Sequence, residues 1–279
     1  MSRLAAFQVR TMRREELPFA IELAAGEGWN PGLDDAACFF AADCSGFLIG
    51  QLGDEPIGCI SAVSYAGRFG FVGLYILRPE FRGHGYGMQM WEAALARLHG
   101  HNVGLDGVVA QQSNYARSGF RLAYRNVRYR GQAEPVSMHA SVALANEGAF
   151  AAIGEFDQQI FPERREAFLR RWLTQPTARA YIARDGSRLT GYAVIRQCRE
   201  GWKIGPLAAD DEVIARRLYD AAVAYPPVGD AVYVDVPEAN PRAQPFLGAL
   251  GLVPVFETAR MYTGPDPCLL YTSPSPRDS

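Results

Sequence analysis

Two halves of the sequence follow one plan, and this repeat constrains the fold more than any other feature. Residues 47–63 predict two strands joined by a Gly-Asp-Glu-Pro turn. Residues 180–197 predict a second hairpin, which turns at Asp185 and Gly186. The two hairpins therefore mark equivalent positions in the two halves.

The glycines around these hairpins keep one spacing. Gly58 and Gly119 are 61 positions apart, and Gly191 and Gly251 are 60 positions apart. Each half then closes with a strand-like run in which a tyrosine precedes a glycine: Tyr129 and Gly131 in the first, Tyr262 and Gly264 in the second. Matching turns at matching spacing favour a tandem duplication over a chance likeness.

Each half also opens with helical segments. Residues 14–29 carry apolar side chains at helical spacing, as do residues 147–161. A further helix is predicted over residues 162–173, with Pro162 in its first turn. Each half thus predicts helices, a hairpin, a strand, a helix, a strand, a helix and a strand. This order is typical of a mixed α/β (α+β) sheet with helices on its faces.

The polar stretch 132–141 separates the halves and predicts two domains, residues 1–133 and 140–267. The last residues, 268–279, are rich in serine and proline and have no core pattern. They resemble a translated sequencing-library adapter, so we interpret them as a non-native tail, the alternative being an ordinary disordered tail.

Charge and composition narrow the classes of function. The net charge is −2 and the two signs are interspersed, which argues against a nucleic-acid or membrane-surface partner. No apolar run reaches the roughly 18–20 residues of a membrane span, and the N-terminus lacks a signal-peptide core, so we expect a cytoplasmic protein. The five cysteines and four histidines lack metal-ligand spacing, so no metal is expected. The oligomeric state is not predicted.

A glycine-rich turn, RPEFRGHGYG at residues 78–87, follows an apolar run at 71–77 and precedes a helical pattern at 88–98. Either a tight bend or a phosphate cradle would explain it, because glycines before a helix let backbone N–H groups approach an anion. The turn lacks the Lys-Ser/Thr of a nucleoside triphosphate loop and is not GxGxxG. The second half repeats the surrounding plan without these glycines, which favours the cradle.

The run LYILRPEFRGHGYG resembles the acetyl-CoA-binding motif of the GNAT N-acetyltransferases, Arg/Gln-x-x-Gly-x-Gly/Ala, filled here by Arg82, Gly85 and Gly87. The resemblance implies two tandem GNAT-like acyl-CoA N-acyltransferase lobes with acetyl-CoA as co-substrate. It implies pyrophosphate contacts from Arg82, Gly83, His84, Gly85, Tyr86 and Gly87. It also implies pantetheine contacts from the strand before the loop, at Ile76 and Leu77.

A second motif lies downstream. The stretch NYARSGF (114–120) resembles the Tyr-x-x-x-Gly-Phe of the same family, in which the tyrosine of many members protonates the departing thiolate of coenzyme A. This resemblance implies that Tyr115 is a catalytic acid. A phenol suits the task, because its pKa, about 10, lies near that of a thiol, about 8.5. The alternative is an amphipathic side chain packed at a helix edge.

The second half has lost the loop. Asp210, Asp211 and Glu212 stand where phosphate would lie, and Leu247 replaces the tyrosine. This half therefore resembles a degenerate GNAT lobe, and GWKIGPL, VDVPEANP and ETARMYTG resemble a C-terminal domain found behind GNAT domains in bacterial proteins. We expect it to wall the acceptor pocket, with pure scaffolding as the alternative.

The acceptor site is less well marked. The acetyl group must be attacked by a neutral nucleophile, so a base or a water chain has to remove a proton from an ammonium. No base is assigned among four acidic candidates: Glu27, Asp34, Asp35 and Asp106. Candidate substrate residues are Trp29, Asn30, Asp106 and Tyr262, with Arg260 as a weaker one.

The leading hypothesis is acetyl transfer from acetyl-CoA to a small-molecule primary amine, by direct attack in a ternary complex. No Cys-His pairing indicates a covalent intermediate. One alternative is a non-catalytic acyl-CoA-binding sensor on the same scaffold. Another is an acetyltransferase acting on protein N-termini or lysines, which would need an open groove for a peptide.

Overall fold

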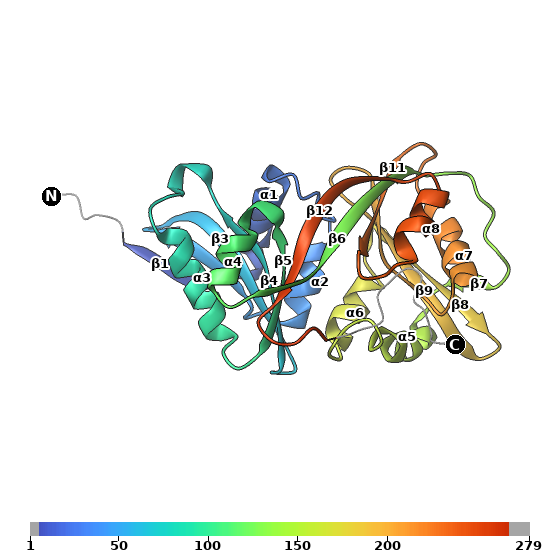
Figure 1. Ribbon diagram of the computed structural model, residues 1–279, viewed down its shortest axis with the longest axis horizontal. Helices are drawn as coiled ribbons and strands as arrows, with labels where there is room; N and C mark the ends of the chain where they lie inside the picture. Colours follow the sequence, from blue (N-terminus) through green and yellow to red (C-terminus); the bar gives the residue numbers. More distant parts are fainter. Residues whose placement is uncertain (1–5, 268–279) are drawn as a thin grey trace.

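The computed structural model describes residues 6–267, and the tail at 268–279 lies outside the described residues. Below, the first half denotes residues 6–133 and the second half residues 140–267. Figure 1 shows the two halves side by side along the long axis, with the long strands β6 and β12 running between them. The linking segment, 133–141, contains no helix or strand. The domain boundary near this segment stays a prediction.

Both halves contain the predicted order of elements. The first half consists of β1 (Phe7–Thr11), η1 (Arg14–Glu16), α1 (Leu17–Gly26), α2 (Asp35–Ala42), β2 (Phe47–Leu52), β3 (Glu55–Tyr65), β4 (Phe69–Leu77), η2 (Pro79–Phe81), α3 (Tyr86–Arg97), β5 (Asn102–Val108), η3 (Val109–Gln111), α4 (Gln112–Arg117) and β6 (Arg121–Gln132). The second half consists of β7 (Val142–Leu144), η4 (Glu147–Ala149), α5 (Phe150–Asp157), α6 (Glu166–Trp172), β8 (Ala178–Asp185), β9 (Arg188–Gln197), β10 (Trp202–Ala209), α7 (Glu212–Val223), β11 (Ala231–Pro237), α8 (Ala243–Ala249) and β12 (Val253–Tyr262).

Two details differ from the prediction. Each half begins with an edge strand, β1 or β7, that the sequence analysis did not foresee. The placement of Pro162 in a first helical turn was wrong, because α6 begins only at Glu166. Residues 158–165 instead form a loop that lies against the first half, so its backbone follows tertiary contacts rather than helix propensity.

The predicted mixed sheet is confirmed, but all twelve strands join in a single sheet. Their order is β1-β2-β3-β4-β5-β12-β6-β11-β10-β9-β8-β7. Only β4–β5 and β10–β11 pair in parallel, and the other neighbours are antiparallel. The last strand of the second half, β12, lies between β5 and β6 of the first. Strand β6 in turn pairs with β11 of the second half, so the halves exchange their closing strands.

The register at this exchange follows the sequence repeat. Across β6 and β12, Arg128 lies opposite Phe256 and Tyr124 lies opposite Arg260. Gly119 and Gly251 are 132 positions apart in the repeat. The same offset relates Arg128 to Arg260 and Tyr124 to Phe256, so it maps the first pair onto the second. It maps the pair of Asn126 and Thr258 onto itself. A local twofold relation therefore passes between these two residues, at the middle of the molecule.

Side chains also cross between the halves. Phe39 of α2 packs against Phe168 and Trp172 of α6, with ring centroids 5.0 and 5.9 Å apart. In return, Phe161 of the second half packs edge-on against Tyr65 and Phe69, at 4.8 and 5.6 Å. Because burying one such side chain contributes roughly 1.5–3 kcal/mol, these contacts hold the halves as one packed body.

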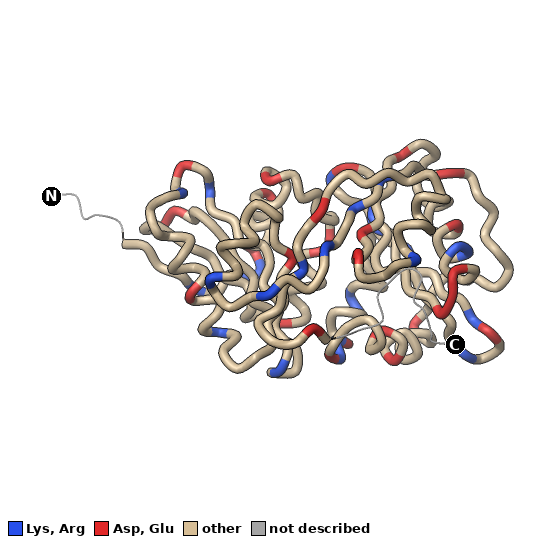
Figure 2. The backbone as a smooth tube through the Cα atoms, in the orientation of Figure 1, with Lys and Arg blue, Asp and Glu red and all other residues tan. Residues whose placement is uncertain are grey.

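Charge is spread over both halves. In Figure 2, basic and acidic residues are interspersed over the tube, and the view shows no large region of one sign. Within residues 6–267, none of the helices is both long and apolar enough to span a bilayer.

Candidate active site

The site begins where β4 and β5 separate. Their parallel pairing runs from Phe69 opposite Asn102 to Val72 opposite Leu105 and then stops. Beyond this point, the register between β3 and β4 shifts and leaves one extra residue on β4. Leu74 lies in this bulge with φ +48°, and its carbonyl accepts the thiol of Cys59 at 3.2 Å. The bulge turns the end of β4 away from β5 and opens a gap between the two strands.

The glycine-rich turn lies directly after β4. Gly83 and Gly85 have φ of +80° and +82°, the left-handed region that glycine adopts without strain. Gly85 is the N-cap of α3, and no side chain caps this helix. A Cβ added at either glycine would meet no heavy atom within 4 Å, so open space lies over the turn. Uncapped N–H groups beside open space suit an anion.

A cavity of about 560 Å³, here the loop cavity, lies over this turn. Its lining residues are Glu27, Trp29, Tyr75, Ile76, Leu77, Arg82, Gly83, Gly85, Gly87, Met88, Trp91, Val108, Gln111, Asn114, Tyr115, Arg117 and Ser118. The structure thus brings most of the predicted loop and strand residues together with Tyr115. His84 and Tyr86 are not among them, and their rings stack on each other at 6.0 Å.

Arg82 is held at the rim of the loop cavity. Its Nε donates to the carbonyl of Leu77 at 2.8 Å, and its guanidinium forms an ion pair with Glu27. The two side chains are 48% and 34% exposed, so a ligand can reach both. The carboxylate of Glu27, one of the four candidate bases, is therefore already paired with an arginine.

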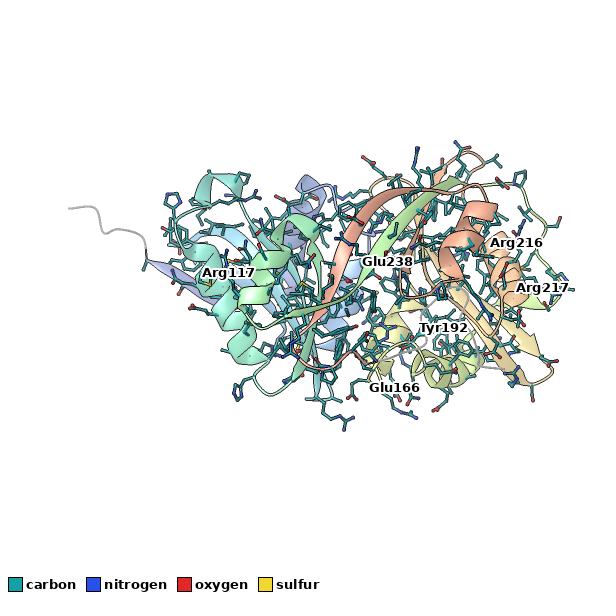
Figure 3. The ribbon with its side chains drawn as sticks, in the orientation of Figure 1. Arg117, Glu166, Tyr192, Arg216, Arg217 and Glu238 are labelled. Carbon is teal, nitrogen blue, oxygen red and sulfur yellow. The ribbon has the colours of Figure 1, made fainter. Side chains whose placement is uncertain are left out.

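Tyr115 lies on α4 against the ring of Trp91, with centroids 5.5 Å apart. Burial raises its pKa above the ordinary value. A Cβ at Gly107 would lie 2.3 Å from the Tyr115 ring, so β5 needs glycine there to leave room for the tyrosine. Sequence reasoning missed Tyr75, Trp91 and Gly107 as residues of this site. Of the three, only Trp91 had a sequence signal, because it lies in the helix that follows the glycine turn. Figure 3 shows Arg117 on α4, the helix that also carries Tyr115.

A second cavity, of about 430 Å³ and here called the central cavity, lies between the halves. Its lining residues are Phe39, Tyr65, Phe69, Phe71, Asp106, Tyr124, Asn126, Arg128, Ile160, Phe161, Pro162, Arg165, Asp235, Pro237, Phe256, Thr258, Arg260 and Tyr262. Val103 and Leu105 of β5 pack in the core that contains α3. Because side chains alternate along a strand, Asp106 points to the opposite face. The central cavity therefore lies on the face of β5 opposite to α3, and among the described residues its lining shares none with that of the loop cavity.

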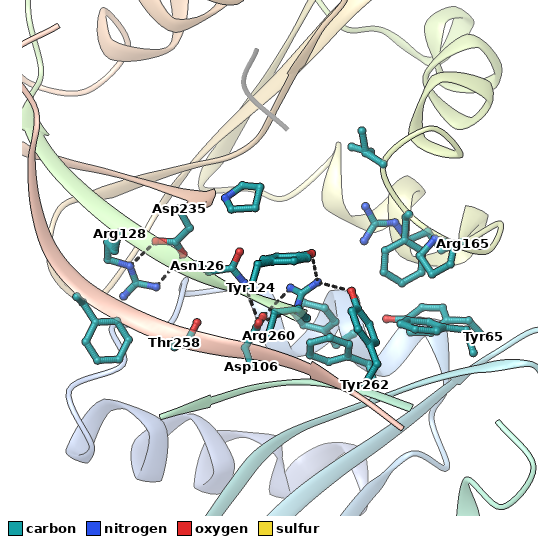
Figure 4. Close-up of a pocket in the computed structure, with 18 residues that line it drawn as sticks. Tyr65, Asp106, Tyr124, Asn126, Arg128, Arg165, Asp235, Thr258, Arg260 and Tyr262 are labelled. Carbon is teal, nitrogen blue, oxygen red and sulfur yellow. Dashed lines mark hydrogen bonds and ion pairs between the residues drawn. The ribbon is translucent and has the colours of Figure 1, made fainter. Parts of the chain in front are cut away.

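Asp106 and Arg260 face each other across β5 and β12. Their two hydrogen bonds measure 2.6 and 2.7 Å, and Asn126 also donates to Asp106 at 2.7 Å. Arg260 donates to the phenol oxygens of Tyr124 and Tyr262 at 3.3 and 3.2 Å (Figure 4). Burial works against the charge of Arg260, but the carboxylate outweighs it and holds the arginine pKa well above its usual range. Two predicted residues, Asp106 and Tyr262, thus meet here.

The repeat places a second pair at the equivalent position. Asp235 lies opposite Arg128 across β11 and β6, with hydrogen bonds of 2.6 and 2.9 Å. Burial alone would raise the pKa of Asp235, but the hydrogen bond and charge of Arg128 lower it below its ordinary value. Arg128 also lies over the ring of Phe256 at 5.5 Å.

The candidate substrate residues Trp29 and Asn30 lie in the loop between α1 and α2. Trp29 lines the loop cavity, but Asn30 lines neither cavity. The amide of Asn30 pairs with the backbone of Glu200 in the second half, at 2.8 and 2.9 Å. Asp34 accepts from Thr177 at 2.7 Å, and Asp35 pairs with Arg196 at 2.7 Å. These polar groups hold the two halves together.

The matching helix start in the second half is closed. Asp211 is the N-cap of α7, and its carboxylate accepts from the N–H of Ile214 at 2.8 Å. Asp210 pairs with Arg188 at 2.5 Å. Leu247, at the place of Tyr115, is fully buried in the core. In the second half, a carboxylate of the protein itself therefore binds an N–H group at the helix start. In the first half, the equivalent N–H groups, at the start of α3, have no side-chain cap.

Within residues 6–267, no group of three or more His, Cys, Asp or Glu side chains is placed to hold a metal ion.

Comparison with known proteins decides the family. Residues 8–120 match the description "Acetyltransferase (GNAT) family", and residues 153–270 match "Acetyltransferase (GNAT) domain". A holothin acyltransferase of Pseudoalteromonas sp. (strain SANK 73390) is 30% identical over 254 residues, which cover 91% of this chain and 86% of that protein. The chain belongs to the GNAT acetyltransferase family. It is a tandem GNAT acyltransferase, with one GNAT region in each half.

Solved structures agree on the fold. A putative acetyltransferase from Pyrococcus horikoshii superimposes with a TM-score of 0.79 at 20% identity, over 95% of this chain and 92% of that chain. A tandem GNAT protein from the clavulanic acid biosynthesis pathway has a TM-score of 0.65 at 15% identity, over 94% and 100% of the two chains. The tandem arrangement inferred from the repeat is thus confirmed.

Proposed function

We propose that this enzyme transfers an acetyl group from acetyl-CoA to a primary amine of a small molecule, by direct attack in a ternary complex within the first half. One observation carries the proposal. The loop cavity brings together an uncapped helix start, the end of β4 that no longer pairs with β5, and Tyr115.

The turn suits the pyrophosphate of coenzyme A. The N-terminus of α3 carries roughly half a positive charge, and backbone N–H groups at residues 83–87 supply donors. Arg82 adds a cation once its pairing with Glu27 opens. The end of β4, at Ile76 and Leu77, no longer pairs with β5, so the pantetheine arm can bind along it.

Acetyl transfer then proceeds at the strand separation. The amine nitrogen attacks the thioester carbonyl from the side of the central cavity, and the carbon–sulfur bond breaks. The departing thiolate takes the proton of Tyr115, the nitrogen loses its own proton to water, and the tyrosinate is then reprotonated from water. The raised pKa of Tyr115 keeps the phenol protonated at neutral pH, ready to donate.

Two features support direct attack on a small acceptor. In the described chain no cysteine lines either cavity, so no thiol is placed to carry the acetyl group. The central cavity, at about 430 Å³, has the size of a small-molecule site and is closed in by both halves.

Initial-velocity kinetics test the proposal. We expect intersecting lines in double-reciprocal plots of acetyl-CoA against amine, because both substrates must be bound together before reaction. Parallel lines, with acetylated enzyme detected by mass spectrometry, would contradict it. Competition with longer acyl-CoA thioesters in the same assay tests the preference for acetyl.

A further inference from the structure

Among the residues that the structure describes, every carboxylate that lines the two cavities is held by an arginine. Asp106 is paired with Arg260, and Asp235 with Arg128. In the loop cavity, Glu27 is paired with Arg82. No histidine lines either cavity in the part of the chain that the structure describes. A carboxylate already bound by a guanidinium is a poor proton acceptor, because accepting a proton breaks the pair.

Three buried phenols of the lining are also unsuited to accept a proton. Burial raises the pKa of Tyr65 to about 12 and raises that of Tyr124 above its usual range, so both phenols stay protonated at neutral pH. In the loop cavity, burial raises the pKa of Tyr75 as well. Arg165, the third arginine of the central cavity, is bound by Asp157 at 2.7 and 2.8 Å. Among the described lining residues, no carboxylate is left unpaired and no histidine is present to act as a base.

This absence restricts the chemistry of the amine. An alkyl amine has a pKa near that of lysine, about 10.4, so only about four molecules in ten thousand are neutral at pH 7. Without a base, such an ammonium cannot attack the thioester at a useful rate. An amine conjugated with an aromatic ring is neutral at pH 7, because its lone pair is delocalised into the ring.

The lining of the central cavity favours the same class of molecule. It is built from aromatic side chains of both halves: Phe39, Tyr65, Phe69, Phe71, Tyr124, Phe161, Phe256 and Tyr262. Flat rings stack on such walls at little cost in conformational entropy. Since every charge named above is paired within the protein, nothing in the cavity calls for an ionic substrate.

We propose that the acceptor is a weakly basic amine conjugated with an aromatic or heteroaromatic ring, bound in the central cavity between the two halves. This inference rests on the proposed function, because it concerns the acceptor of the same acetyl transfer. It makes the second half a determinant of specificity, since Phe161, Phe256 and Arg260 come from it.

The first test compares matched amines. Ring amines such as anilines are paired with their ring-saturated counterparts, the cyclohexylamines, and coenzyme A release is followed as a function of pH. At pH 7 we expect kcat/KM to be about 10²-fold higher for the aromatic member of each pair. It should be flat across neutral pH for anilines and rise about tenfold per pH unit for cyclohexylamines. Equal efficiency at pH 7 would overturn the inference.

The second test measures binding without turnover. Titration calorimetry of anilines into the protein loaded with coenzyme A compares wild type with Phe161→Ala, which removes one wall of the cavity. We expect at least a tenfold loss of aniline affinity and unchanged acetyl-CoA affinity. The control, Phe150→Ala, removes a ring of the same half that lines neither cavity and should change neither affinity. Unchanged aniline affinity in Phe161→Ala contradicts the inference.

The two proposals fail in different ways. A protein that binds no acetyl-CoA contradicts the proposed function. A protein that binds acetyl-CoA but acetylates cyclohexylamines as fast as anilines contradicts only the acceptor class. If Asp106→Asn removes an activity that depends on pH, Asp106 is the base and the inference is wrong.

Discussion

At the scale of single residues, the glycine turn combines two requirements that no other residue meets. Gly85 has a φ of +82°, and its Cβ position faces open space at the start of α3. A side chain there strains the backbone and also occupies the space proposed for pyrophosphate. Backbone strain would follow from substituting any glycine at positive φ. Only the loss of space for pyrophosphate would affect ligand binding directly.

This difference gives the first prediction. Gly85→Val should abolish acetyl-CoA binding, measured by titration calorimetry, because strain and branching both fall on the cradle. Gly100 has the same φ, +82°, and open space around it, but it lines no part of the loop cavity. Gly100→Val should therefore lose similar stability and keep its affinity. Retained acetyl-CoA binding in Gly85→Val would show that the turn does not bind the pyrophosphate.

The second prediction concerns the proton donor. Tyr115→Phe should lower kcat by about 10²-fold, within the range for removal of a catalytic acid, and leave the acetyl-CoA affinity unchanged. The phenyl ring keeps the packing on Trp91, so the protein should stay folded. An unchanged kcat would return Tyr115 to a packing role.

The sequence predicted residues of the turn better than residues of the acceptor site. Phosphate binding needs a local run of glycines, which is visible as a motif. The pairings of Asp106 with Arg260 and of Asn30 with Glu200 join residues more than 150 positions apart. Nothing local in the sequence marks such partners. For Asn30, the sequence does give a weak local indication of a turn. Asparagine tolerates the left-handed backbone conformation that this residue adopts, with φ +50°.

At the scale of elements, the starts of α3 and α7 have opposite properties. The N-terminus of α3 follows glycines and has no side-chain cap, whereas α7 is capped by the carboxylate of Asp211. A capped helix start is more stable, and an open one can bind an anion. In the duplicated fold, the start of α3 is therefore suited to binding a ligand, and the start of α7 is suited to stabilising the fold.

The third prediction follows from this cap. Asp211→Ala should lower the free energy of unfolding by about 1 kcal/mol in urea titrations, because the N–H of Ile214 loses its partner. Asp211→Asn keeps an acceptor at the same place and should cost little. Catalysis should be unaffected in both variants. A loss of activity without a loss of stability would mean that the second half takes part in binding the co-substrate.

Element order was predictable because turns, glycines and periodicity are local signals. The start of α6 was not, since Phe161 is drawn into the core of the first half and Pro162 into the lining of the central cavity. The strands β1 and β7 were missed because both are short edge strands, at Phe7–Thr11 and Val142–Leu144, whose pairing depends on neighbours distant in sequence.

At the scale of the whole molecule, the exchange of closing strands makes each half incomplete. Without β12, the strands β5 and β6 lose the neighbour that lies between them. The local twofold relation places the central cavity at this junction, where Arg260 of the second half reaches Asp106 of the first. The duplication was visible in sequence, but the exchange was not, because equivalent strands have the same pattern and could pair within either half.

The fourth prediction tests this dependence. Residues 1–133 expressed alone should not reach the native fold, as seen by poor amide dispersion in NMR spectra, because β5 and β6 would present unpaired edges. Co-expression with residues 134–279 should restore dispersion and acetyl-CoA binding. A folded first half that binds acetyl-CoA alone would show that the exchange is dispensable.

The central claim is that the first half of this tandem enzyme acetylates a small amine directly from acetyl-CoA. The most direct measurement incubates the protein with acetyl-CoA and a panel of amines and quantifies both free coenzyme A and N-acetylated product by mass spectrometry. The account predicts equal amounts of the two products, with anilines ahead of cyclohexylamines and with Tyr115→Phe strongly impaired. Tight acetyl-CoA binding without an N-acetylated product from any amine would contradict it and favour a sensor.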